Sequence, residues 1–101
     1  MKIDIKEENG VLTGTLEGWL DTNVAAQFNE DIKPLMEQAD KTIVLNCEGL
    51  QYISSSGLRA FLALRKESAA RGGKIVITNI NDEIRKVFTM TGFFNLFDIR
   101  N

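Results

Sequence analysis

The sequence contains no histidine, and among its 101 residues there are one cysteine and one proline. Without histidine the chain cannot build a Ser-His-Asp or Cys-His nucleophile, or a metal site with histidine ligands. The single cysteine, Cys47, can form neither an internal disulfide nor a site with several thiolate ligands. These absences exclude the commonest catalytic and metal-binding arrangements. We therefore expect a protein that is not an enzyme and that carries no metal or cofactor.

Long apolar runs are also missing. The longest run, residues 60–64, is far shorter than the roughly 18 residues of a membrane span, and residues 1–8 lack the apolar segment of a signal peptide. The 14 acidic and 12 basic residues give a net charge of −2, which is poorly suited to nucleic acid or to a membrane surface. We expect a cytoplasmic protein that binds neither.

The apolar pattern that is present predicts one α/β domain over residues 1–101. Ile3 and Ile5 alternate with charged residues, as in a half-exposed strand, and Asn9-Gly10 is typical of the turn of a hairpin. Four further strands are predicted at residues 11–16, 42–47, 74–78 and 96–99.

Helical spacing of apolar residues predicts three helices. The first follows Asp21, a candidate N-cap, and is interrupted at Pro34. The second begins at Ser55 or Ser56 and ends near residue 70, and the third spans about residues 81–92.

The resulting order, β-β-α-β-α-β-α-β, predicts a single mixed sheet with one antiparallel hairpin at its N-terminal end and helices packed against it. Crossovers between strands should be right-handed and should join parallel strands. Residues 17–20 and 48–53 are predicted to be loops. If the strands before them are parallel, these loops lie at one edge of the sheet, where ligands and partners commonly bind.

Three consecutive serines, Ser54, Ser55 and Ser56, open the second helix. One interpretation is capping, in which a hydroxyl accepts a bond from a free amide and contributes about 1 kcal/mol; one serine is enough for that. The other is phosphorylation, because the positive end of a helix dipole tolerates the charge of a phosphoserine. The fold would then survive while the surface changes, as a reversible binding switch requires. The sequence leaves both interpretations open.

Charges near these serines are unevenly distributed. Arg59 lies in the first turn of the second helix, where a cation opposes the dipole unless a phosphate or an acidic partner residue pairs with it; the alternative is a solvated arginine. Residues 21–40 contain five carboxylates and one lysine, whereas residues 57–77 contain five cations and one glutamate. This asymmetry either steers a protein partner or attracts the two helices to each other.

Several motifs follow one another along the chain in a characteristic order: residues 16–21 (LEGWLD), 43–46 (IVLN), 55–58 (SSGL), Gly72-Gly73 before a strand, and residues 87–92 (VFTMTG). With this order and spacing, the chain resembles the STAS domain family and, within it, the bacterial anti-sigma factor antagonists.

The resemblance implies a phosphorylation cycle. An unmodified antagonist binds an anti-sigma factor that is also a serine kinase, and a sigma factor is released. The kinase then phosphorylates the antagonist and the complex dissociates, until a metal-dependent phosphatase restores the serine. The family's acceptor serine corresponds to Ser55. Ser54 stands where the family usually has aspartate and is a second candidate acceptor, and Asp21 corresponds to an acidic residue near the kinase contact.

The resemblance thus predicts a docking surface made of Asp21, Ser54, Ser55, Ser56, Gly57, Leu58 and Arg59. The alternative is a STAS-type regulatory module in a transporter or sensor assembly that binds a small ligand or a nucleotide. It predicts a concave site lined by Leu20, Tyr52 or Phe61, whereas the switch predicts a shallow exposed surface. A small hydrolase would need a base to activate a serine, and no lysine lies within the motif.

Overall fold

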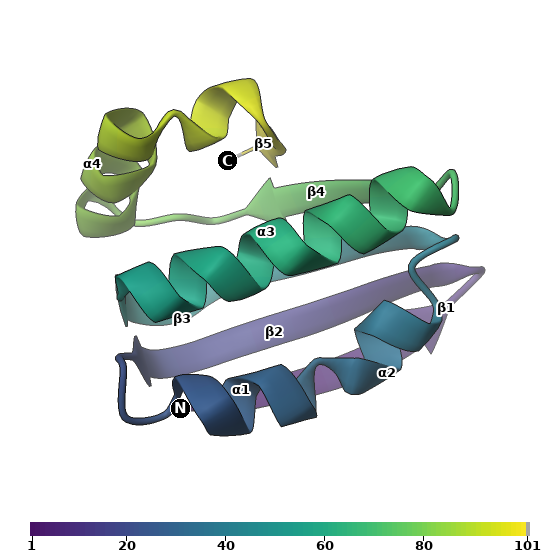
Figure 1. Cartoon of the computed structure of the whole chain (residues 1–101), viewed down its shortest axis with the longest axis horizontal. Helices are drawn as coiled ribbons and strands as arrows, with labels where there is room; N and C mark the ends of the chain where they lie inside the picture. Colours follow the sequence, from purple (N-terminus) through teal and green to yellow (C-terminus); the bar gives the residue numbers. More distant parts are fainter. Residues whose placement is uncertain (101) are drawn as a thin grey trace.

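A five-stranded sheet with the strand order β1-β2-β3-β4-β5 organises the chain (Figure 1). The computed structural model describes residues 1–100. The strands are β1 (Lys2–Glu8), β2 (Val11–Leu20), β3 (Thr42–Ile53), β4 (Lys74–Thr78) and β5 (Asp98–Arg100). β1 and β2 are antiparallel, and every later neighbour is parallel. This mixed sheet with its N-terminal hairpin confirms the predicted fold class.

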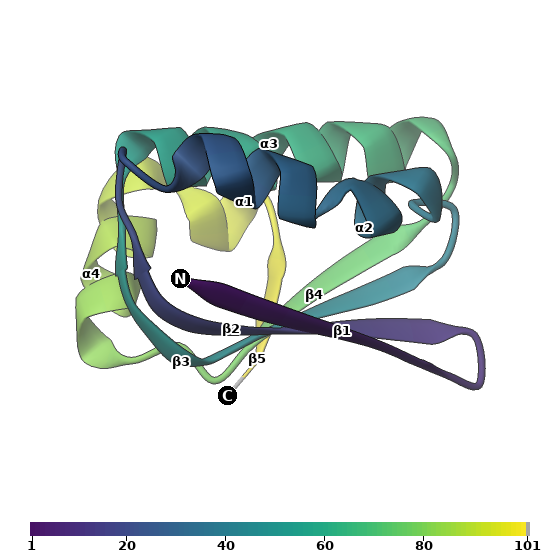
Figure 2. The same ribbon diagram turned by 90° about the horizontal axis from the view of Figure 1, so that it is seen from below.

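Helices α1, α2 and α3 lie together on one side of the sheet, and α4 lies beyond the end where β2 and β3 finish (Figure 2). The helical segments are α1 (Ala25–Asp31), α2 (Lys33–Glu37), α3 (Ser55–Ala70), α4 (Asp82–Thr91) and the 3-10 helix η1 (Phe93–Asn95). No helix within residues 1–100 has both the length and the apolar character needed to cross a bilayer.

Two predicted local features, the hairpin turn and the helix interruption, are confirmed. Asn9 and Gly10 have φ angles of 53° and 79°, the left-handed pair that a tight hairpin turn requires. Pro34 lies in the first turn of α2, where its missing N–H leaves no helical bond unmade, so the predicted interruption separates α1 from α2.

The prediction that residues 17–20 and 48–53 are loops is wrong, because both segments continue their strands. β2 and β3 remain paired as far as Leu20 and Ile53, through irregularities in register near Glu17 and Trp19. Gly18, with a φ of 104°, accommodates part of this distortion. In β3 the buried residues Cys47, Leu50 and Ile53 are three positions apart, so the two-residue alternation is lost there, and this obscured the strand in the sequence.

The last strand is also shifted from its predicted position. β5 begins at Asp98, whereas Leu96 and Phe97 belong to the turn that follows η1. The N–H of Phe97 donates to the carbonyl of Phe93, so the chain is still coiled where the sequence predicted an extended segment. β5 pairs with β4 only from Asp98 onward.

A chain of aromatic side chains runs through the core. Phe28 of α1 contacts Phe61 of α3 at a ring-centroid distance of 6.2 Å, and Phe61 contacts Phe88 of α4 at 6.5 Å. Phe88 stacks on Phe93 at 4.9 Å, and Phe93 packs on Phe97 at 5.2 Å. All five are buried, so one core joins the helices above the sheet to the C-terminal segment.

Candidate functional site

The parallel ends of β2 and β3 create the site. Leu20 and Ile53 are paired at the last position of the two strands, and the N–H of Ser54 donates to the carbonyl of Leu20 at 2.8 Å. Asp21 and Ser54 therefore leave the sheet side by side. This confirms that the two segments predicted to meet at one edge do so.

Ser54 is the N-cap of α3. Its backbone is extended (φ −87°, ψ 171°), and its Oγ accepts a hydrogen bond from the N–H of Gly57 at 3.2 Å. The residue is only 7% exposed. Capping is thus carried by Ser54, which leaves the next two serines free for other roles.

Ser55 is the first residue of α3 and is exposed. Its hydroxyl makes no hydrogen bond to any other residue in the described part of the chain. Ser56 is half-buried and accepts a hydrogen bond from Nη2 of Arg59 at 3.3 Å. Ser55 is therefore the most exposed of the three serines.

Gly57 allows α3 to pack closely on the strand ends. A Cβ at this position would come within 2.7 Å of Cγ of Leu20 and 2.9 Å of Cγ1 of Ile53, which is too close for any side chain. Leu58 is half-buried and packs against the core, while Arg59 is exposed. The glycine thus sets the distance between the serine-bearing turn of α3 and the ends of β2 and β3.

The prediction that Asp21 is the N-cap of the first helix is wrong. α1 begins at Ala25, and Val24 occupies the cap position without any side-chain bond. Oδ1 of Asp21 accepts a hydrogen bond from the N–H of Val24 at 3.2 Å, which closes a turn before the helix. The half-buried carboxylate is therefore held at the same edge as the serines.

A groove of about 460 Å³ runs between α1 and α3 beside these residues. Small residues line most of it: Thr22, Ala25, Ala26, Asn29, Ser56, Arg59, Ala60 and Ala63. Because these side chains are short, a partner can approach both helices closely. The groove begins where Ser56 and Arg59 stand, so it continues the surface that carries Ser55.

The opposite charges of the two helical regions do not pair. Within residues 1–100, no ion pair joins the acidic segment 21–40 to the basic segment 57–77. A hydrogen bond from Nη1 of Arg71 to the carbonyl of Glu37 at 2.9 Å joins the two segments, in addition to the packing of Phe28 on Phe61. Direct ion pairing between the helices therefore does not explain the asymmetry.

An exposed aromatic pair was missed at the sequence level. Trp19 of β2 and Tyr52 of β3 are 56% and 43% exposed and stack with their ring centroids 5.3 Å apart. Nε1 of Trp19 donates to Oε1 of Gln51 at 2.8 Å. The available signal was the alternation of Glu17 and Trp19 with apolar neighbours, which indicates an outward-facing tryptophan if the segment is a strand.

The aromatic pair borders a groove of about 400 Å³ whose other residues are Gln51, Ile53, Glu83, Ile84 and Val87. Leu20 and Phe61, which the ligand-binding alternative placed around a concave site, are both buried in the core. Of the three residues named for that alternative, Tyr52 alone borders this groove.

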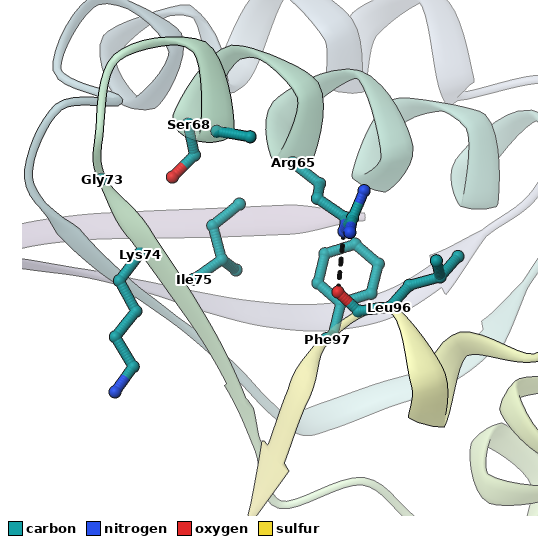
Figure 3. A pocket seen from close by; sticks show the side chains of 8 residues that line it. Arg65, Ser68, Gly73, Lys74, Ile75, Leu96 and Phe97 are labelled. Atoms are coloured by element: carbon teal, nitrogen blue, oxygen red, sulfur yellow. Dashed lines mark hydrogen bonds between the residues drawn. The ribbon is translucent and has the colours of Figure 1, made fainter.

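A smaller pocket of about 170 Å³ lies at the other end of α3 (Figure 3). Nε of Arg65 donates to the carbonyl of Leu96 at 2.7 Å, while the side chain of Lys74 extends away from this bond. Because Arg65 bridges α3 to the turn after η1, we attribute a structural role to this cation.

The arrangement of the sheet and helices, with a serine-bearing turn opening α3, matches a known family. The model of the STAS domain family matches residues 2–101. The chain belongs to the STAS domain family.

Two similar proteins are named as anti-sigma factor antagonists. BtrV of Bordetella bronchiseptica, named as a candidate anti-sigma factor antagonist, is 29% identical over 101 residues, which are 100% of this chain and 87% of BtrV. The anti-sigma-B factor antagonist of Bacillus subtilis is 28% identical over 100 residues, covering 98% of this chain and 90% of that protein.

The STAS fold of the chain also matches solved structures. One is the anti-sigma factor antagonist SpoIIAA in its unphosphorylated form, with a TM-score of 0.79 and 24% identity. The match covers 99% of this chain and 89% of that chain. SpoIIAA has also been solved in a phosphorylated form (TM-score 0.73, 24% identity, 99% of this chain and 92% of that chain).

Proposed function

We propose that this STAS protein is an anti-sigma factor antagonist whose binding is ended by phosphorylation of Ser55. The observation that carries the proposal is the exposed hydroxyl of Ser55 at the first position of α3, next to a helix end that Ser54 already caps. The names of the relatives and the existence of a phosphorylated form of SpoIIAA support it.

The geometry favours Ser55 over Ser54 as the acceptor. The Oγ of Ser54 is held by the N–H of Gly57, and the residue is almost fully buried, so a kinase would have to break the helix cap to reach it. Ser55 is exposed and needs no such rearrangement.

Docking in this proposal uses a switch surface, which we define as Asp21 together with residues 54–59. The anti-sigma factor contacts this surface when Ser55 is unmodified, and it releases its sigma factor. The α1–α3 groove continues the surface and offers the partner a close approach between two helices.

Phosphorylation then changes the surface while the scaffold is retained. The partner acts as a serine kinase: Oγ of Ser55 loses its proton and bonds to the γ-phosphorus of ATP, and the bond from that phosphorus to the β–γ bridging oxygen breaks, which releases ADP. The positive end of α3 and the guanidinium of Arg59, four residues on, both favour the added charge. A metal-dependent phosphatase later hydrolyses the phosphoester.

The phosphate weakens docking because an interface must remove it from water. An uncompensated charge in a desolvated contact costs several kcal/mol, and about 1.4 kcal/mol corresponds to a tenfold loss of affinity. One modification can therefore lower affinity by orders of magnitude without unfolding the protein.

The test compares Ser55→Ala and Ser55→Asp in binding to the anti-sigma factor of the source organism by calorimetry. Ser55→Ala should bind like the unmodified protein and should resist phosphorylation by that partner. Ser55→Asp should bind at least about 30-fold more weakly, while its melting temperature changes by less than about 3 °C.

Lys66→Gln is the matched control, because it changes the net charge by the same amount at an exposed position in the C-terminal half of α3. The two positions are eleven residues, or about 16 Å, apart along the helix. If Ser55→Asp and Lys66→Gln bind equally well, or if Ser55→Ala is still phosphorylated, the proposal is wrong.

A further inference from the structure

Trp19 and Tyr52 are the two most exposed aromatic side chains among residues 1–100. Trp19 and Tyr52 occupy paired positions on adjacent parallel strands, and the indole N–H is anchored by Gln51. Because the strands and this hydrogen bond fix their orientation, little conformational entropy is lost when a partner covers them. Rigid exposed aromatics of this kind are typical of the residues that dominate the affinity of an interface.

The groove beside them is lined by apolar side chains and one carboxylate. Ile84 and Val87 of α4 line the groove together with the aromatic pair, and Glu83 is the charged residue among the lining residues. Nζ of Lys86 lies 3.5 Å from Oε1 of Glu83, and both side chains are more than 70% exposed. Such an exposed ion pair contributes little to stability, so a cation of a partner can take the place of Lys86. A carboxylate that lines the same groove as Trp19 and Tyr52 is suited to a cation.

A phosphate-bearing ligand fits this groove less well. No lysine or arginine is among the residues that line it. The positive end of the α4 dipole is already met by the cap Asn81, which accepts a bond from the N–H of Ile84, and by Asp82 and Glu83 in the first turn. A nucleotide could stack its base on Trp19, but its phosphates would find no cationic partner.

The groove is close to the switch surface along both strands. Trp19 comes two residues before Asp21, and Tyr52 comes three residues before Ser55. Three extended residues span about 10 Å, so one partner can cover both sites. Exposed Glu17 and Glu48 precede the aromatic residues on the same strands and add to the negative charge of this end of the sheet.

From these observations we infer that the Trp19/Tyr52 groove is a second docking point, which receives an arginine-bearing segment of the anti-sigma factor that binds the switch surface. The inference rests on the proposed function for the identity of the partner. A guanidinium is planar, so it stacks on the aromatic faces while its N–H groups reach the carboxylate of Glu83. The aliphatic stem of the arginine covers the apolar side chains that line the groove.

Trp19 is the sole tryptophan of the chain, so its fluorescence reports on this groove alone. The probes are a capped peptide of alternating leucine and arginine, and a twin in which neutral citrulline replaces each arginine. We expect the arginine peptide to change the emission of Trp19 saturably and to bind at least about tenfold more tightly than its twin. ATP should leave the emission unchanged.

Glu83→Gln should lower the affinity for the arginine peptide by at least about fivefold. The matched control is Glu37→Gln on α2, which lies at the opposite end of the molecule from α4 (Figure 1) and should bind like the parent protein. Equal affinity for the two peptides, no saturable change with the arginine peptide, or competition by ATP would each overturn the inference.

A second measurement separates this inference from the proposed function. Trp19→Ala and Glu83→Gln should each lower affinity for the intact anti-sigma factor by about tenfold or more, and Ser55→Asp should weaken each variant further. If Ser55→Asp weakens the complex but neither groove variant does, the inference is wrong and the proposed function stands. If the groove variants weaken the complex and Ser55→Asp does not, the phosphoswitch is wrong and the groove stands.

Discussion

Cys47 shows how strongly the fold can change the chemistry of a single side chain. Its thiol is completely buried in β3, where Sγ contacts the carbonyl of Leu45 at 3.8 Å. Burial disfavours the thiolate and raises the pKa of Cys47 from 9.0 to about 12. The side chain therefore acts as a small apolar group and is unsuited to nucleophilic or redox chemistry.

This shift predicts a loss of stability at alkaline pH. The unfolded thiol ionises near pH 9 and the folded thiol near pH 12, so the native state holds more protons between these values. Raising the pH then favours unfolding. Between pH 7 and pH 10, we expect the free energy of unfolding of the parent protein to fall by about 1 kcal/mol more than that of Cys47→Ala. Urea unfolding of both proteins at these two pH values measures the difference.

Cys47→Ala is itself the control, because every other titratable group is present in both proteins and contributes equally to the two slopes. Identical slopes for the parent and Cys47→Ala would show that the thiol is not protected in the native state. Rapid modification of Cys47 by a thiol reagent under native conditions at pH 8 would contradict the same prediction.

At the scale of elements, the N-terminus of α3 shows how one turn divides roles among similar residues. Helical geometry places Ser54 outside the first turn with its hydroxyl directed at the N–H of Gly57, and it places Ser55 on the exposed side. Close packing at Gly57 then fixes the whole turn against Leu20 and Ile53. Helix capping is thus carried by Ser54, and the signalling role that we propose falls to the adjacent Ser55.

This division predicts different effects on stability for two equivalent substitutions. Ser54→Ala removes the cap and should lower the free energy of unfolding by about 1–2 kcal/mol. Ser55→Ala removes an exposed hydroxyl with no partner in the described chain and should change it by less than about 0.5 kcal/mol. Chemical denaturation of the two variants checks this, and equal losses would show that Ser54 is not the cap that stabilises α3.

At the scale of the whole molecule, the buried phenylalanines connect elements that are far apart in sequence. Phe61 is central, since it contacts Phe28 of α1 on one side and Phe88 of α4 on the other. The segments above the sheet should therefore unfold together with the C-terminal part in a single transition.

Phe61→Ala should lower the free energy of unfolding by about 3–5 kcal/mol, because it leaves a cavity in contact with three helices. Leu62→Ala is the control, since the adjacent leucine is exposed and should change stability by less than about 1 kcal/mol. Far-UV circular dichroism and the fluorescence of Trp19 should give coincident unfolding curves for each protein. Separate transitions would contradict a single cooperative core.

Features that depend on near neighbours in the chain could be predicted from the sequence. The turn at Asn9-Gly10, the interruption at Pro34 and the serine-bearing start of α3 all follow from the conformational preferences of a few consecutive residues. The order of strands and helices then restricts the connections to a mixed sheet. This was enough to predict the fold class and to bring Asp21 and Ser55 to one edge.

Features that depend on distant pairing required the tertiary structure. The C-terminal parts of β2 and β3 look like loops because they contain bulges, and they become strands only when they pair with each other. That pairing places Trp19 and Tyr52 face to face, although they are separated by a helical region in the sequence. Local patterns cannot encode such contacts, because hydrogen bonds and stacking between distant segments form only after the chain has folded.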